Sequence, residues 1–74
     1  MKSLEYYMSL PYRIEIVPDS DEGGFVVSFP ELKGCLSCGK SIEEAIRNAE
    51  NAKTLWLTAA IEEGIGIPEP GGQH

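Results

Sequence analysis

The sequence predicts an α+β fold: a short N-terminal helix, then a three-stranded antiparallel sheet covered by one long helix. Residues 41–64 repeat apolar side chains at the spacing of an amphipathic helix, and residues 12–40 hold short apolar segments between turns rich in proline and glycine. At about 1.5 Å per residue, such a helix extends roughly 33 Å and can cover a small sheet. We expect a single domain made of an N-terminal arm or short helix (1–11), the sheet (12–40), the long helix (41–64) and an extended tail (65–74).

The composition indicates a globular protein with an acidic surface. Hydrophobic residues make up 42% of the chain, and Asp and Glu outnumber Lys and Arg by 12 to 6, which gives a net charge of −6. Binding to a phosphate backbone needs clustered Lys and Arg, so this balance argues against direct nucleic-acid binding and suits a basic protein partner. The chain has no apolar run of 18 residues and no signal-peptide pattern at its start, so we expect a cytoplasmic protein without membrane contact.

The N-terminal arm and the first strand are separated by a proline. Ser3 can cap a short helix, which Pro11 then ends. The segment that follows, YRIEIV, alternates apolar and charged side chains. This pattern predicts a half-buried strand with Tyr12, Ile14 and Ile16 on its core face.

Two further strands and a turn complete the predicted sheet. Residues 19–24 read DSDEGG, a composition typical of a tight turn, and residues 25–29 alternate as a second strand of an antiparallel hairpin. Residues 35–38, CLSC, form a short apolar segment just before the long helix and predict the third strand.

The long helix has recognisable start and stop signals. Ser41 and Glu44 have capping-box spacing, in which each side chain accepts a hydrogen bond from the other's backbone N–H. Gly64 supplies a left-handed stop, and Pro68 prevents the helix from restarting. The stripe that we expect against the sheet consists of Ile42, Ala45, Ile46, Ala49, Ala52, Trp56, Ala59 and Ala60.

Several helix residues fall outside this stripe. Lys53 is expected on the polar surface, whereas Leu55, Leu57 and Ile61 make the apolar surface wider than one sheet face requires. This excess predicts a partner subunit.

Two clusters invite a metal or redox interpretation, and each has a simpler explanation. The carboxylates of residues 19–22 are ligands that Ca²⁺ prefers, but acidic residues beside two glycines are typical of a solvated turn. Cys35 and Cys38 have C-x-x-C spacing, but zinc needs four ligands, so buried small side chains are the favoured interpretation. Because no nucleophile–histidine set or phosphate-binding glycine loop is present in the sequence, we expect neither enzyme activity nor a cofactor.

Four segments, in this order and spacing, resemble the HicB-like antitoxin family: YYMSLPYRIEI (6–16), EGGFVVSFPELKGC (22–35), GKSIEEAI (39–46) and GIGIPEP (64–70). The resemblance implies a partial ribonuclease-H-like fold without the acidic catalytic set of true ribonuclease H. It also implies a partner, a small basic HicA-like toxin that cleaves messenger RNA. Many members continue into a DNA-binding domain that this sequence does not show, so we expect no direct nucleic-acid binding by this chain alone.

The partner contacts that we expect involve two sets of residues. On the antitoxin interpretation, the toxin-binding residues are Asp21, Glu22, Glu31 and Leu32. If the first strand is an open edge of the sheet, it favours pairing with another chain, and the expected oligomer interface is Tyr12, Ile14, Leu57 and Ile61. The alternative function is a solitary, small oligomeric protein with a structural or regulatory role and no toxin.

Overall fold

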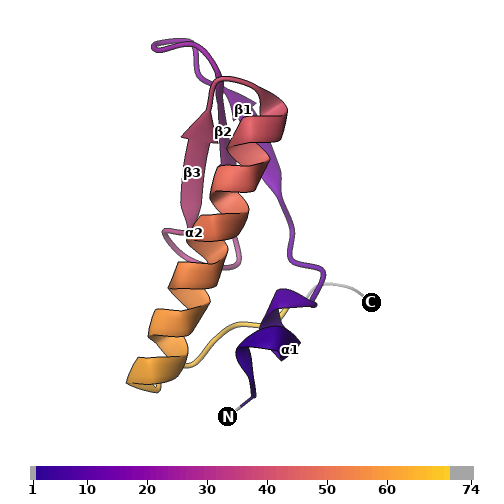
Figure 1. Ribbon diagram of the computed structural model, residues 1–74, viewed down its shortest axis with the longest axis vertical. Coiled ribbons are helices and arrows are strands. Elements are labelled where there is room, and N and C mark those ends of the chain that lie inside the picture. The colour runs from indigo at the N-terminus through magenta and orange to yellow at the C-terminus, as the bar shows by residue number, and fades with distance from the viewer. Residues whose placement is uncertain (1, 71–74) are drawn as a thin grey trace.

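Two helices and three strands follow one another along the chain in the expected order (Figure 1). The computed structural model describes residues 2–70. The elements are α1 (Leu4–Met8), β1 (Glu15–Pro18), β2 (Phe25–Ser28), β3 (Leu36–Gly39) and α2 (Ile42–Glu63). The α+β prediction, with its short N-terminal helix, antiparallel sheet and long helix, is therefore confirmed.

The sheet has the strand order β1-β2-β3, with both pairs antiparallel. In the register, Val27 of the central strand lies between Ile16 of β1 and Ser37 of β3. α2 packs mainly on β3 and β2, so β1 lies at the edge of the sheet that the helix does not cover (Figure 1). Val27 is accordingly buried, whereas all four residues of β1 are exposed.

The first strand is shorter and more exposed than the sequence predicted. It begins at Glu15 rather than Tyr12, and Ile14 and Ile16 remain 42% and 41% exposed. The strand ends at Pro18, one residue beyond the predicted segment YRIEIV. The backbone N–H of the next residue, Asp19, points toward β2, so position 18 directs its nitrogen to the outer edge, where a proline loses no ladder bond.

Both ends of α2 have the caps that the sequence predicted, with one change of partner. Ser41 Oγ accepts a hydrogen bond from Glu44 N–H at 3.1 Å. The Glu44 carboxylate accepts from Lys40 N–H at 2.7 Å, one residue before the N–H expected. Gly64 follows the helix with φ +72°, a conformation that glycine adopts without strain.

The buried side of α2 differs from the predicted stripe. Its buried residues are Ala45, Ala49, Lys53, Leu57 and Ala60. Leu57, expected outside the stripe, is fully buried, and Lys53, expected on the polar surface, is only 5% exposed. The second half of α2 extends past the sheet and packs against α1 (Figure 1), so its buried side is set by a second neighbour that the periodicity did not reveal.

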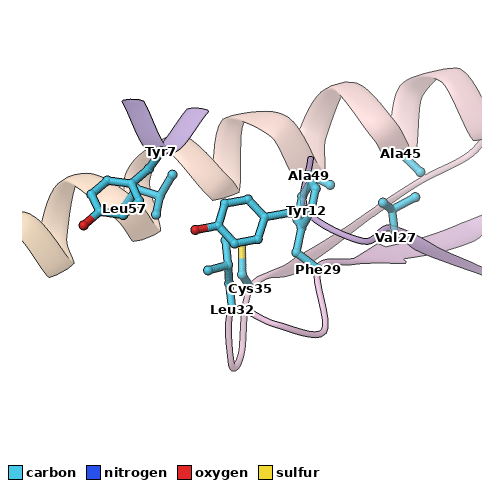
Figure 2. Close-up of a cluster of buried hydrophobic side chains, with 9 residues drawn as sticks. All are labelled: Tyr7, Tyr12, Val27, Phe29, Leu32, Cys35, Ala45, Ala49 and Leu57. Carbon is cyan, nitrogen blue, oxygen red and sulfur yellow. The ribbon is translucent and has the colours of Figure 1, made fainter. Parts of the chain in front are cut away.

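Buried side chains from both helices, from β2 and from the connectors form one core (Figure 2). They are Tyr7, Tyr12, Val27, Phe29, Leu32, Cys35, Ala45, Ala49 and Leu57. The ammonium group of Lys53 lies beside this core. Its Nζ is 4.9 Å from the centre of the Phe29 ring and 3.7 Å from Glu50 Oε1. The negative ring face and the carboxylate together compensate the ammonium group, while its methylene chain fills apolar space.

The tail packs along the N-terminal arm. Tyr12 Oη donates to the Pro68 carbonyl at 2.6 Å, and Tyr6 Oη donates to Glu69 Oε1 at 3.2 Å. Ile67 is partly buried against the core, whereas Ile65 is 50% exposed. Burial, and then the nearby Glu69 carboxylate, raise the pKa of Tyr12 to about 12.

We expect Gly39→Ala to lower the free energy of unfolding by about 1–3 kcal/mol, the range for overpacking a filled site. A Cβ at this position would lie 2.5 Å from the backbone nitrogen of Ala45 and 2.8 Å from its Cα, so α2 must move away from β3. Gly66→Ala is the control, because no atom lies within 4 Å of its added Cβ. Urea denaturation measures both variants, and equal stabilities would contradict the close packing described here.

We expect stability to fall as the pH rises from about 10 to about 12, partly because Tyr12 ionises. Its pKa is raised from 10.0 to about 12 in the folded protein, so its contribution is complete below the unfolded value and is lost through the folded one. Tyr12→Phe removes this group and should flatten that part of the stability profile, at the cost of its hydrogen bond to Pro68. Denaturant titrations of both proteins from pH 10 to pH 12 measure the free energy of unfolding. Parallel pH profiles of the two proteins would contradict the assigned role of Tyr12.

Candidate partner-binding surface

One end of the molecule gathers carboxylates from two segments that are distant in sequence. The β1–β2 turn supplies Asp19, Asp21 and Glu22, and the first turn of α2 supplies Glu43 and Glu44. We call these five residues the acidic end (Figure 1, where the turn and the start of α2 lie at the top). A hollow of about 240 Å³ lies between the two segments, with Asp19, Glu22 and Glu44 in its lining.

The turn is held rigid by its own first carboxylate. Asp19 Oδ1 accepts from the N–H groups of Asp21 and Glu22 at 3.1 and 3.3 Å. The backbone of Asp19 also bonds to Gly23 and Gly24, both at 2.9 Å, and both glycines have positive φ. Asp19 is thus occupied within the turn, while Asp21 and Glu22 are exposed.

The helix side of the hollow is fixed by hydrogen bonds to the backbone around β3. Glu44 accepts from Lys40 N–H, and Asn48 Nδ2 donates to the Cys38 carbonyl at 2.8 Å. Lys40 is the one basic residue in the lining of the hollow. The field at this end is therefore dominated by negative charge.

Neither the acidic residues nor the thiols are arranged as a metal site in the described part of the chain. Within residues 2–70, no group of three His, Cys, Asp or Glu side chains is placed to hold a metal ion. Both cysteines are free: Cys35 is buried as expected, but Cys38, also expected in the core, is exposed, because the two lie on opposite faces. Burial raises the pKa of Cys35, which makes its thiol less reactive.

The four residues predicted to bind the toxin are not brought together. Asp21 and Glu22 lie in the β1–β2 turn, while Glu31 and Leu32 lie in the β2–β3 connector at the opposite end of β2. Glu31 Oε1 accepts from Arg13 N–H at 2.9 Å and so positions the start of the first strand. Leu32 is fully buried in the core, so its side chain is not part of a surface.

The residues predicted for an oligomer interface are also divided. Tyr12 and Leu57 are buried within the single chain, at 7% and 0% exposure, and belong to its own core. Ile61 is half-buried against that core. Ile14 alone of the four is exposed, and it lies at the uncovered edge beside β1.

Sequence reasoning missed Glu43, Glu44 and Asn48 as surface neighbours of the turn. Glu44 had been assigned only to helix capping. The signal that could have found them is topological: the β1–β2 turn and the end of β3 meet at the same end of an antiparallel sheet, so the start of α2 must lie there too.

Comparison with known proteins identifies the family. Residues 12–72 match the model of the HicB-like antitoxin of bacterial toxin-antitoxin systems, and the chain belongs to this family. Within the described residues, no helix is long and apolar enough to cross a membrane.

Relatives and a solved structure agree with this assignment. The chain is 50% identical over 44 residues to a UPF0150 protein of Helicobacter pylori, a match that covers 60% of this chain and 61% of that protein. It is 45% identical over 57 residues to the UPF0150 protein ssl0259 of Synechocystis, covering 77% of each. The crystal structure of TTHA0281 from Thermus thermophilus has a similar fold, with a TM-score of 0.75, 29% identity and coverage of 93% of this chain and 82% of that one.

Proposed function

We propose that this protein neutralises a small, basic HicA-like toxin that cleaves messenger RNA, by binding it directly in the cytoplasm. On this proposal the chain is a binding protein and not an enzyme, with a partial ribonuclease-H-like fold. Membership of the antitoxin family supports a role in a toxin-antitoxin system. The acidic end is the observation that carries the choice of partner.

The acidic end suits a basic partner for two physical reasons. Its carboxylates lie on a turn and a helix start that are both fixed by hydrogen bonds, so little ordering is needed when a partner docks. Clustered charge of one sign also steers an oppositely charged protein and raises its association rate. A toxin surface that binds RNA must be positive, and covering it would block its substrate.

We expect co-expression with the toxin-like protein encoded beside this chain to restore growth and to yield a complex that copurifies. The host carrying the toxin-like gene alone supplies the reference for toxicity. Failure of both rescue and copurification would reject the proposed function. It would favour the second candidate, a solitary oligomeric protein, for which the exposed edge of the sheet is the specific observation.

We expect the double reversal Asp21→Lys with Glu22→Lys to weaken toxin binding about tenfold or more and to reduce its dependence on salt, because attraction becomes repulsion. The matched control is Glu62→Lys with Glu63→Lys, the same change in charge on exposed residues at the far end of α2. Isothermal titration at two salt concentrations gives the affinities. Equal losses in the two double variants would show that net charge, and not the acidic end, determines binding.

Glu31→Lys tests separately whether the β2–β3 connector contacts the toxin. The Glu31 carboxylate accepts a hydrogen bond from Arg13 N–H. The charge reversal at Glu31 is therefore compared with Glu31→Gln, whose side-chain oxygen can still accept that bond. If the connector is a contact, the Lys variant binds more weakly than the Gln variant while both remain folded.

A further inference from the structure

The outer edge of the first strand has hydrogen-bonding groups that the described residues leave unpaired. Arg13 N–H reaches Glu31 and Asp19 N–H reaches Gly24, so the odd-numbered positions from 13 to 19 face inward to the connector and to β2. By alternation, the N–H and C=O groups of Ile14 and Ile16 point outward. Among residues 2–70, no hydrogen bond to these outward groups is present.

The opposite edge of the sheet, at β3, is closed at one position by a side chain of α2. In β3 the backbone of Cys38 points outward, because Phe29 N–H bonds to Cys35 C=O and the ladder alternates from there. Asn48 of α2 donates to this outward Cys38 carbonyl at 2.8 Å. A side chain thus occupies the β3 edge at Cys38, where Leu36 is the one exposed large apolar residue of that strand, whereas the edge at β1 has three: Ile14, Ile16 and Val17.

The charges beside this edge fit a second copy of the same chain. Arg13 and Glu15 flank Ile14 symmetrically and are both exposed, with side-chain exposures of 70% and 48%. Within one chain Arg13 Nη2 lies 3.6 Å from Glu15 Oε2, an exposed ion pair that contributes little and can exchange for the same pair between two chains. If two copies pair antiparallel with Ile14 opposite Ile14, each Arg13 faces the partner's Glu15. These positions form non-hydrogen-bonded pairs, in which side chains approach most closely.

Other symmetric registers are less favourable. Pairing Ile14 with the partner's Ile16 places Glu15 opposite the partner's Glu15, and like charges directly opposed are destabilising. Pairing Ile16 with the partner's Ile16 places Pro18 opposite Ile14, where the proline has no N–H to donate. In a twofold interface each residue meets the partner's symmetry-related surface, so opposite charges on the two sides of Ile14 suit an axis at Ile14.

We propose that two copies of this chain associate antiparallel about a twofold axis at Ile14, immediately before β1, so that their two sheets lie edge to edge. Ile14 N–H donates to the partner's Ile14 carbonyl, and Arg13 pairs with the partner's Glu15. Because the strands run in opposite directions, the two acidic ends lie at opposite ends of the dimer and stay accessible. The association needs no toxin, so it can be tested independently of the proposed function.

Sedimentation equilibrium of the full chain over a range of concentrations tests this proposal. We expect a reversible dimer for the unaltered chain, and a dimer dissociation constant about tenfold higher for Arg13→Glu, in which two attractive pairs become repulsive. Arg47→Glu, the same charge change on an exposed residue of α2, is the matched control and should dimerise normally. Ile14→Pro should abolish the dimer without breaking a bond to β2, because the N–H that it removes points outward.

Mixing two charge-reversal variants distinguishes a loss of pairing between chains from a loss of folding. Arg13→Glu and Glu15→Arg should each dimerise poorly alone, whereas an equal mixture should form a heterodimer with both charge pairs restored. Circular dichroism confirms that each variant is folded. A monomer for the unaltered chain at all concentrations, or equal dimerisation of Arg13→Glu and Arg47→Glu, would overturn the proposal.

Discussion

The close contact between α2 and β3 determines the rest of the architecture. Gly39 ends β3 where the backbone of Ala45 passes, and an added Cβ there would meet the helix backbone at 2.5 Å. Ala45 and Ala49 continue this contact with side chains too small to hold the helix away from the sheet. The helix is therefore placed over β2 and β3, which buries Val27 and leaves the first strand without a cover. The exposed edge is thus a consequence of how closely the helix packs.

The elements could be predicted from the sequence because each depends on local signals. Ser41, Glu44 and Gly64 mark the ends of α2, and residues 19–24 mark the hairpin turn. The burial of Lys53 and Leu57 could not be predicted, because it depends on α1 and on the ring of Phe29, which lie far away in sequence. Periodicity gives the direction of a side chain on its own helix, but it does not say which neighbours surround that helix.

The candidate surface, too, has residues that local sequence predicts and residues that only the fold brings there. Asp21 and Glu22 were found from turn chemistry, and they are exposed in the structure. Leu32 was predicted to bind the toxin together with Glu31, yet neighbouring residues in a connector point in different directions, and Leu32 fills the core. Glu43 and Glu44 join the turn only because the chain reverses direction in the β2–β3 connector, so that β3 ends beside the turn. Which strand ends meet is a property of topology, and no single segment of sequence contains it.

The net charge of −6 sets a condition on any self-association, because two such chains repel each other. An antiparallel arrangement meets this condition. It places the two acidic ends at opposite ends of the dimer. A single chain is already 39 Å in its longest dimension, several times the screening length of about 8 Å at physiological salt. Only Arg13 and Glu15 then face each other closely, and they are of opposite sign. The negative charge of the acidic ends therefore does not oppose pairing along the β1 edge. On the two proposals, one small domain can bind a basic partner and a second copy at the same time.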